Sequence, residues 1–313
     1  MKTFLALRIR PWGLLGAVGA LAVGGTLAGF AAPVGWVFDL ATNFRVQYFV
    51  TLTLLAILFA VGRRHRAAGG FGIVALLNLA VIVPLYVGGE PTGASSIRAI
   101  LLNVHTENRR FDLVREFILR EEPDVVVFEE VNDEWLAELT KLGGDYSHIL
   151  PAPRPDNFGM ALFSRWPMQD AEIREIGDAD VPSVIAHVVI RGKRLTIIGT
   201  HPLPPANPEN FGLRNRQLIA LAGLAGTRSG PLIILGDLNT TPWSPHFRAL
   251  LTAANVRNAS RGHGLNASWP VPIFPMRIPI DHCLVSREIL VSKVRVGPNV
   301  GSDHFPLIVD FAL

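Results

Sequence analysis

The sequence predicts an α/β fold of mixed sheets covered by helices, preceded by about three transmembrane helices. Three long apolar stretches within residues 1–90 predict the membrane part. After residue 96, short apolar runs typical of strands alternate with helical patterns, and both hairpins and helix crossovers connect them. We therefore expect a membrane anchor over residues 1–90, a linker over residues 91–96 and a folded domain over residues 97–313.

The predicted anchor consists of apolar stretches at residues 12–38, 46–62 and 71–89. The first contains no charged residue, and about 20 apolar residues suffice to cross a bilayer. A signal peptide is the alternative for this first stretch. Its apolar core is too long for a signal peptide, and two further stretches follow it. The pattern therefore favours three spans.

Basic residues predict the orientation of these spans. They precede the first span and fill the connection between the second and third: Lys2, Arg8, Arg10, Arg63, Arg64 and Arg66. Basic loops stay on the cytoplasmic side. We therefore expect a multi-pass protein of the inner or plasma membrane with a cytoplasmic N-terminus. Its folded domain is expected in the periplasm or outside the cell.

Charge and cysteine content narrow the function classes. Residues 1–90 hold seven Lys or Arg and two Asp or Glu. Residues 91–313 hold 22 Lys or Arg and 24 Asp or Glu, which gives this part a net charge of −2. The folded domain therefore lacks the overall positive charge typical of tight nucleic-acid binding. A local basic groove is still compatible with these counts. The single cysteine, Cys283, excludes an internal disulfide framework.

The elements of the folded domain can be predicted in chain order. Strands are expected at IRAILLNV, DVVVFEEV and GMALFSRWP, and a hairpin at SVIAHVVI and RLTIIGTH with its turn at residues 191–193. Later strands are expected at PLIILGDLN, IDHCLVS and PLIVDFAL. Apolar residues at helical spacing predict helices at NRRFDLVREFILREE and RNRQLIALAGLAG.

Polar side chains collect at the ends of these predicted strands. Six separate segments each bring carboxylate, amide or imidazole groups there: Asn103; Glu129 and Glu130; His201; Asp237 and Asn239; Asp281; and Ser302, Asp303 and His304. Each alone is ordinary, since Asp-x-Asn after a strand is usually a turn. Together they predict a ligand site at the strand ends. Oxygen donors with little clustered histidine suit Mg²⁺ or Mn²⁺ rather than Zn²⁺.

The ordered set LLNV, PDVVVFEEV, GMALFSR, GTHP, LGDLN, IDHCLVS and GSDHFP resembles the endonuclease/exonuclease/phosphatase superfamily with the DNase I-like fold. The membrane anchor together with GTHPLPP and NTTPWSP is similar to the bacterial YafD-like branch. The resemblance covers residues 97–313. It implies a four-layer α/β sandwich, in which two mixed sheets face each other with helices outside.

The resemblance also implies roles for individual residues. Asn103 and Glu130 match the metal-binding pair, and Asp303 matches an aspartate that helps to bind metal or to orient the following histidine. Asp237 matches the residue that activates or orients the attacking water. Three matched groups contact the phosphate: His201, Asn239 and His304. Asp281 matches the aspartate that supports a histidine in the site. Either Asp237 or the His304–Asp281 pair is compatible with the role of general base. Glu129 stands where the family usually has glutamine.

Metal-dependent hydrolysis of a phosphoester is therefore the expected function. A nuclease is the default by analogy with the family. A phosphodiesterase or phosphatase acting on lipid or sugar-phosphate headgroups is the alternative, and it agrees with a tethered, nearly neutral domain. A membrane-anchored binding module without turnover is a second alternative, although every catalytic position is filled. The sequence leaves the substrate and the oligomeric state open.

Two further features stay open at this stage. Arg214 and Arg216 begin a helix shortly after GTHPLPP, where either a phosphate contact or a surface position agrees with the sequence. Trp243 and Trp269 lie in proline-rich loops, where packing is more common than contact with a base or with lipid.

Overall fold

The structure is a computed structural model, and it describes residues 11–88 and 97–313. The chain divides into two compact units, Met1–Val83 and Pro84–Leu313, and each is described by itself. The predicted linker at residues 91–96 lies outside the described residues.

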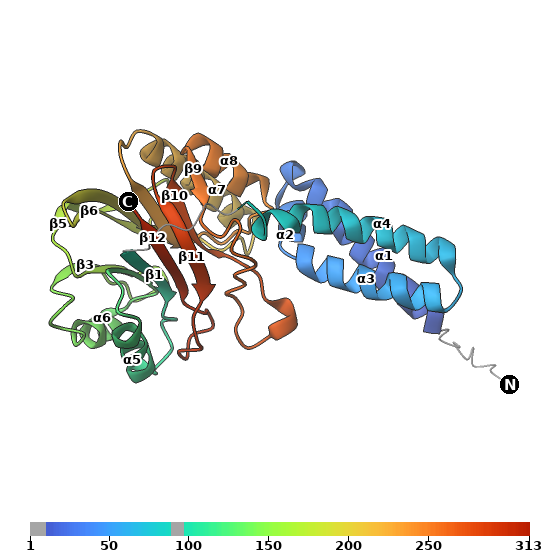
Figure 1. The fold of residues 1–313 in the computed structure, drawn as a ribbon, viewed down its shortest axis with the longest axis horizontal. Helices are drawn as coiled ribbons and strands as arrows, with labels where there is room; N and C mark the ends of the chain where they lie inside the picture. The colour runs from blue at the N-terminus through green and yellow to red at the C-terminus, as the bar shows by residue number, and fades with distance from the viewer. Residues whose placement is uncertain (1–10, 89–96) are drawn as a thin grey trace. The chain divides into compact units, whose positions relative to one another are not determined.

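The described part of the first unit is helical (Figure 1). Its elements are α1 (Pro11–Phe30), the 3-10 turn η1 (Ala32–Val34), α2 (Trp36–Thr42), α3 (Arg45–Val61) and α4 (His65–Ile82), which runs into η2 (Val83–Leu85). Over the described residues, two helical stretches are long and apolar enough to cross a membrane, Pro11–Phe30 and His65–Leu85. A third span is reached only if α2 and α3, which are bent by 65°, count as one.

The first predicted span, residues 12–38, is not one continuous helix. Helix α1 ends at Phe30, and η1 with Pro33 in its first turn separates it from α2. Proline lacks a backbone N–H and disfavours helical backbone at the preceding residue, so it interrupts a long apolar helix. Hydropathy alone did not reveal this break, because every residue on both sides of it is apolar or small.

A buried polar cluster joins three helices of the first unit. Arg45 at the start of α3 is 2% exposed and donates to the carbonyl oxygen of Thr26 in α1 at 3.0 Å. Asn78 of α4 donates to Oγ1 of Thr26 at 2.9 Å and accepts from Arg45 at 3.4 Å. Buried polar groups among apolar helices need such partners, and here they fasten the helices to one another.

The second unit contains two six-stranded mixed sheets. The first has the order β11-β12-β1-β2-β4-β3 and the second the order β5-β6-β7-β8-β10-β9. The strands of the first sheet are β1 (Ile97–Asn103), β2 (Val125–Glu129), β3 (His148–Ala152), β4 (Met160–Ser164), β11 (Leu290–Val296) and β12 (Leu307–Ala312). Those of the second are β5 (Met168–Glu175), β6 (Pro182–Ile190), β7 (Lys193–Thr200), β8 (Leu232–Asp237), β9 (Val256–Asn258) and β10 (Asp281–Ser286).

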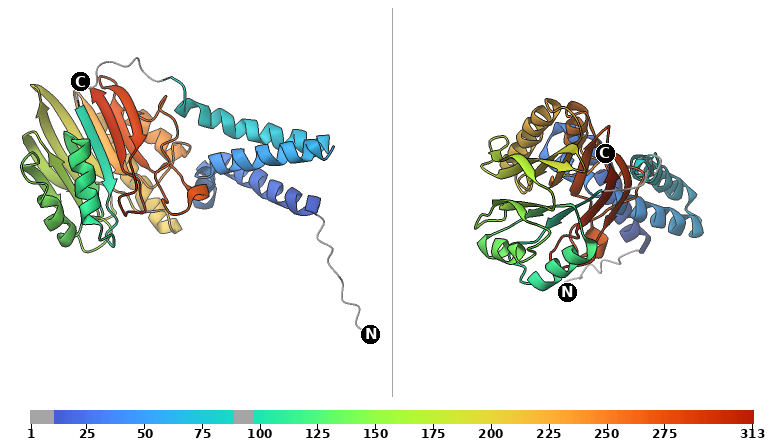
Figure 2. Two further views of the ribbon diagram at one scale, coloured as in Figure 1. Left: turned by 60° about the horizontal axis from the view of Figure 1, so that its bottom comes forward. Right: turned by 60° about the vertical axis from the view of Figure 1, so that its left-hand side comes forward.

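The sheets face each other and helices cover their outer faces (Figures 1 and 2). One pair is α5 (Phe111–Glu121) and α6 (Asp133–Thr140), which lies on the first sheet. The other pair is α7 (Pro208–Gly226) and α8 (Pro245–Ala253), which lies on the second sheet. This arrangement confirms the predicted α/β fold of two mixed sheets flanked by helices.

Alternation along the central strands explains why these layers form. In β1, Ala99 and Leu101 lie in the core between the sheets, whereas Ile100 and Leu102 lie in the core beneath α5 and α6. Successive side chains of a strand point to opposite faces, so a strand covered on both sides is apolar at every position. The continuous apolar runs in the sequence have this cause.

At the centre of each sheet lies a parallel pair. β1 pairs in parallel with β2, and β7 pairs in parallel with β8. The carboxyl ends of two parallel strands meet at one edge of a sheet, which is where ligands bind in open α/β sheets. Four of the predicted polar segments follow these four strands, and this edge of each sheet therefore carries the candidate site.

Candidate active site

Glu129 connects the site edges of the two sheets. It is the last residue of β2 and its side chain is fully buried. Its carboxylate oxygens accept from the backbone N–H of Asp237, the last residue of β8, at 3.0 and 3.2 Å. Burial raises the pKa of Glu129 well above its ordinary value, and the nearby carboxylates of Asp237 and Asp281 raise it further. No role for Glu129 is predictable from the sequence, because its contact joins residues 108 positions apart.

Asn103 and Glu130 form a pair at the edge of the first sheet. The amide of Asn103 donates to Oε1 of Glu130 at 2.9 Å, and both side chains are buried. The other carboxylate oxygen, Oε2, accepts from the backbone N–H of Thr106 at 3.2 Å. Glu130 has φ of 59°, a left-handed backbone conformation that is uncommon outside glycine and often occurs at functional sites.

Asp281, His304 and Asp237 form the centre of the site. Asp281 opens β10 and pairs in register with Asp237 at the end of β8. Nδ1 of His304 donates to Oδ2 of Asp281 at 2.9 Å. The other ring nitrogen, Nε2, lies 3.8 Å from Oδ2 of Asp237. All three side chains are at least 95% buried.

The charges of this group depend on one another. Burial acts to lower the pKa of His304, but the carboxylates of Asp281 and Asp237 outweigh it and raise the value to about 10. Burial acts to raise the pKa of Asp281, and the interaction with His304 lowers it overall. Burial and Asp281 raise the pKa of Asp237, which His304 only partly opposes. Below about pH 10, His304 therefore carries a positive charge beside two carboxylates.

His201 lies on the other side of Asp237. It follows β7, it is 3% exposed, and its Nε2 lies 3.7 Å from Oδ2 of Asp237. Both this separation and that to His304 exceed a hydrogen bond, so Oδ2 of Asp237 faces two imidazoles without bonding to either. Burial and the charge of His304 lower the pKa of His201 to about 4. His201 is therefore neutral at neutral pH, and the ring of Phe158 lies 5.3 Å from its own.

Asn239 is held by three hydrogen bonds beyond the end of β8. Its backbone N–H donates to Oδ1 of Asp237 at 2.8 Å, and its side-chain amide donates to the carbonyl of Pro202 at 2.9 Å. Its carbonyl accepts from Nη1 of Arg214 at 2.8 Å. Asn239 also has a left-handed backbone, with φ of 49°.

Ser302 connects this centre to Asn103, and Asp303 follows it in the chain. The hydroxyl of Ser302 donates to the carbonyl of Asn103 at 2.8 Å and accepts from the backbone N–H of His304 at 3.0 Å. One oxygen of Asp303, Oδ2, accepts from the indole of Trp269 at 3.0 Å. The other, Oδ1, is buried without a hydrogen bond and lies 3.3 Å from Nδ1 of His105.

The predicted metal ligands supply oxygen donors only. They are the amide of Asn103 and the carboxylates of Glu130 and Asp303. In the part of the chain that the structure describes, no group of three or more His, Cys, Asp or Glu side chains is arranged to hold a metal ion. The buried Oδ1 of Asp303 lacks a hydrogen-bond donor, and an all-oxygen set of this kind suits a hard cation. By donor chemistry these residues fit Mg²⁺ or Mn²⁺.

Several residues left open by the sequence lie away from the centre. Arg216 is half exposed and pairs with Asp178 at 3.0 Å, so it has a surface position. Trp243 is buried. Arg214 is only 1% exposed and bonds to the site through Asn239, so a surface position does not describe it. Its role was missed because helix α7 gives no signal for contact with a strand end.

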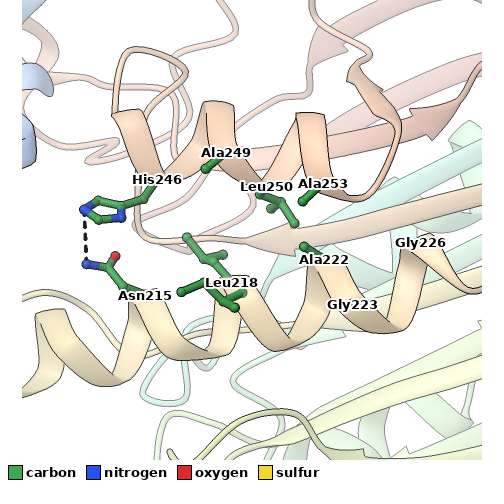
Figure 3. Close-up of a pocket in the computed structure, with 10 residues that line it drawn as sticks. Asn215, Leu218, Ala222, Gly223, Gly226, His246, Ala249, Leu250 and Ala253 are labelled. Atoms are coloured by element: carbon green, nitrogen blue, oxygen red, sulfur yellow. Dashed lines mark hydrogen bonds between the residues drawn. The ribbon is translucent and has the colours of Figure 1, made fainter.

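A cavity of about 520 Å³ lies between α7 and α8 (Figure 3). Its lining is mostly apolar and includes Leu218, Ala222 and Leu250. At one end, Asn215 reaches toward His246, with 3.3 Å between Nδ2 and Nε2. It contains none of the predicted site residues.

The family model described as "Endonuclease/Exonuclease/phosphatase family" matches residues 100–304. No curated protein matches the chain. Solved structures similar to it include a humanized D. rerio TDP2 at 16% identity, with a TM-score of 0.58 over 69% of this chain and 99% of that one. Another is the mannosyl-6-phosphatase Bt3783 of Bacteroides thetaiotaomicron, at 16% identity, with a TM-score of 0.59 over 70% of this chain and 100% of that one. A third is beta toxin from Staphylococcus aureus, at 18% identity, with a TM-score of 0.55 over 68% and 99%. At these identities the likeness establishes the fold.

Proposed function

Because this chain belongs to the endonuclease/exonuclease/phosphatase family, we propose that it is a divalent-metal-dependent phosphoester hydrolase anchored in a membrane. Family membership supports phosphoester hydrolysis in general. The observation that carries the specific proposal is the position of Asp237, whose Oδ2 lies 3.7 Å from His201 and 3.8 Å from His304. In such an arrangement the carboxylate can orient a water molecule while the two imidazoles donate hydrogen bonds to a phosphate at the same place.

Asp237 takes the role of general base in this proposal. Its raised pKa makes it a stronger base than an ordinary aspartate, and its Oδ2 is not committed to a hydrogen bond within the site. It orients the attacking water and accepts the proton as the water attacks phosphorus. His304 is unsuited to this role because Asp281 keeps it protonated.

His304 and His201 take different roles because their charges differ. The imidazolium of His304 donates through Nε2 to an oxygen that gains negative charge in the transition state. Asp281 fixes the ring through Nδ1 and stabilises its positive charge. Neutral His201 donates one hydrogen bond to the phosphate, without adding a second positive charge.

The proposed metal ligands are Asn103, Glu130 and Asp303. A bound Mg²⁺ or Mn²⁺ would neutralise charge on the phosphate oxygens and stabilise the leaving oxygen. The chain's own contribution is to hold the ligands: Thr106 donates to Glu130, and Trp269 donates to Asp303. These bonds restrict the carboxylates to fixed orientations.

For the substrate, a nuclease is the family default. The net charge of −2 over residues 91–313 gives no general attraction for long nucleic acid, and it favours the lipid or sugar-phosphate alternative. A mannosyl-6-phosphatase among the similar folds agrees with that alternative. A binding module without turnover is disfavoured because the carboxylates and imidazoles that catalysis needs are all present.

The proposed location is a membrane, with the N-terminus in the cytoplasm and residues 97–313 in the periplasm or outside the cell. It rests on two helices apolar enough to span a bilayer, a third span if α2 and α3 act together, and the basic residues Arg63, Arg64 and Arg66. With residues 1–90 as anchor and 91–96 as linker, this is the architecture of the YafD-like branch. A periplasm-dependent reporter fused after Leu313 tests it, and a cytoplasmic signal would contradict it.

A substrate screen of the full-length chain in detergent tests the function. The panel contains single- and double-stranded DNA, RNA, glycerophospholipids and hexose 6-phosphates, each with Mg²⁺, with Mn²⁺ and with a chelator. We expect metal-dependent release of product from at least one class, with the chelator abolishing it. Turnover that persists in the chelator would contradict the metal dependence, and no turnover on any class would contradict the function.

A further inference from the structure

We propose that Arg214 is a positioning residue that fixes the orientation of the Asp237 carboxylate through the backbone of Asn239. The inference rests on the proposed function, since Asp237 is the base there. Arg214 lies on α7 and donates to a carbonyl oxygen just beyond the end of β8.

The environment of Arg214 is unusual for an arginine. The residue is 1% exposed, and a buried guanidinium needs hydrogen bonds to replace those of water. Nη1 donates to the carbonyl of Asn239 at 2.8 Å, and Nε donates to Oδ1 of Asn215 at 2.9 Å. The ring of Phe211 stacks against the guanidinium at 5.1 Å. The planar group is therefore held in one orientation toward Asn239.

The local sequence fixes where Arg214 stands. Asn207 caps the start of α7 by accepting from the backbone N–H of Asn210 at 2.8 Å, and Pro208 begins the helix. Arg214 lies two turns further on, on the face toward the second sheet. Asn215 in turn bonds His246 of α8, as Figure 3 shows. The donor to Asn239 is thus supported from two helices.

The backbone of Asn239 is in a less favoured conformation that such bonds help to hold. Its φ of 49° lies in the left-handed region, which asparagine adopts more readily than other residues with a side chain but which still costs free energy relative to the right-handed region. The bond from Arg214 fixes the carbonyl side of Asn239, and the bond from its amide to Pro202 fixes the side chain. With both in place, its N–H points at Oδ1 of Asp237.

This N–H decides which oxygen of Asp237 faces the histidines. Since Oδ1 accepts from Asn239 at 2.8 Å, the carboxylate cannot rotate freely and Oδ2 stays toward His201 and His304. If Asn239 relaxes to a right-handed backbone, its N–H turns away and this restraint is lost. Removing Arg214 should therefore reduce turnover more than substrate binding. Its effect is one of orientation, because the largest influences on the pKa of Asp237 are burial, Asp281 and His304.

The experiment compares Arg214→Met and Arg214→Lys with Arg216→Met in the full-length chain. Arg216 is the matched control, since it is two residues away on the same helix and its bond to Asp178 is exposed. We measure kcat and KM with bis(4-nitrophenyl) phosphate and Mn²⁺, and hydrogen exchange of a peptide covering residues 235–242. The exchange measurement reports the Asn239 amide whether or not this probe is hydrolysed.

For Arg214→Met we expect kcat to fall about 10–100-fold, KM to stay within about threefold, and exchange of the 235–242 peptide to become faster. Arg214→Lys should recover part of kcat, because its ammonium can still donate to Asn239. Arg216→Met should match the wild type in all three measurements. Exchange unchanged in Arg214→Met, or wild-type kcat in a folded Arg214 variant, would overturn the proposal. If Arg214→Met does not fold, Arg214→Lys decides, and it should then show reduced kcat and faster exchange.

A double variant separates positioning from general stability. Glycine adopts a left-handed backbone without strain, so Asn239→Gly no longer needs the bond from Arg214. In that background, Arg214→Met should change the remaining kcat by less than threefold. If Arg214→Met lowers kcat in the Asn239→Gly background as much as it does in the wild type, Arg214 does not act through the backbone of Asn239. Failure of the wild type to hydrolyse any phosphoester would instead count against the proposed function, and the exchange result would still test the inference.

Discussion

Among residues 11–88 and 97–313, each unit buries one arginine, and the two arginines have different consequences. Arg45 is 2% exposed and donates to the carbonyl of Thr26, which joins helix α3 to α1. Arg214 is 1% exposed and donates to the carbonyl of Asn239, which joins helix α7 to the end of β8. In both cases the arginine takes the place of water as hydrogen-bond donor to a backbone carbonyl oxygen. Only the second carbonyl belongs to a residue that also bonds a predicted catalytic group.

Burial of a charged side chain therefore does not by itself mark a functional site. The polar cluster of Arg45, Thr26 and Asn78 is satisfied mainly by its own members and fastens helices. At the site edge of the sheets, by contrast, two imidazoles converge on one carboxylate oxygen, Oδ2 of Asp237. Nδ1 of His201 and Oδ1 of Asp303 are buried without a hydrogen bond. Such atoms are suited to act on a ligand.

The largest loss of activity is expected from a change at Asp237 in the candidate site. Asp237→Asn keeps the shape of the side chain but removes its basicity, so we expect kcat to fall by about 10²–10⁴-fold. Asp178→Asn is the control, because Asp178 is exposed and pairs with the exposed Arg216. Hydrolysis rates of both variants at saturating metal and substrate check the prediction. Equal rates for the two would remove Asp237 from the mechanism.

Glu129 tests whether the contact between the sheets supports the site. Glu129→Ala leaves the backbone N–H of Asp237 buried without an acceptor, which should lower the free energy of unfolding by about 1–3 kcal/mol. Glu129→Gln keeps an acceptor oxygen and removes a carboxylate that burial and neighbouring acids disfavour, so we expect wild-type or greater stability. Urea unfolding of the three proteins distinguishes these outcomes. An alanine variant as stable as the wild type would show that the contact is energetically neutral.

The pH dependence of stability tests the buried neutral histidines. Burial lowers the pKa of His282 to about 4, and its Nε2 donates to the carbonyl of Thr240 at 2.8 Å. Since the unfolded chain binds this proton near pH 6.5 and the folded chain only near pH 4, stability is full above pH 6.5 and falls as the pH drops through this window. One such histidine corresponds to about 3 kcal/mol.

Comparing wild type with His282→Gln isolates this contribution from the acidic groups that titrate nearby. The difference in unfolding free energy should narrow or change sign as the pH falls from 7 to 4. Parallel pH profiles for the two proteins would mean that His282 is protonated in the folded chain at an ordinary pH.

The smallest effect on activity is expected from the first unit. Arg45→Met removes the donor to Thr26 and should destabilise the helical unit by about 1 kcal/mol, a typical value for polar contacts between membrane helices. The hydrolysis rate should stay at the wild-type value, because none of the bonds of Arg45 described above involves the site. Thermal unfolding in detergent and the hydrolysis rate check both parts. A tenfold loss of kcat in a folded Arg45→Met protein would show that Arg45, like Arg214, affects turnover.

Much of the fold was predictable because local patterns determine it. The apolar runs of β1, β2 and β8 identify strands buried on both faces, and the turn at residues 191–193 predicts the hairpin of β6 and β7, which the structure confirms. Strands with exposed or irregular patterns, such as β5 and β11, were missed. The break after Phe30 was also missed, since hydropathy does not register where an apolar helix stops.

The candidate site was predictable to a different extent. Residues at strand ends, such as Asn103 and Asp237, are found because strand position and residue type coincide. Glu129 and Arg214 are not, because their contacts reach across 108 and 25 positions and depend on how layers pack. The role of Glu129 is visible only once the two sheets face each other.

If the ends of both sheets form one site, Asp237 and His304 act together in hydrolysis, and a double-mutant cycle measures this coupling. The hydrolysis rates of the wild type, Asp237→Asn, His304→Asn and the double variant are measured with one substrate under saturating metal. Residues that act as a unit give non-additive losses, so the double variant should be about as slow as the slower single variant. Losses that multiply in the double variant, or single variants that keep the wild-type rate, would contradict the account.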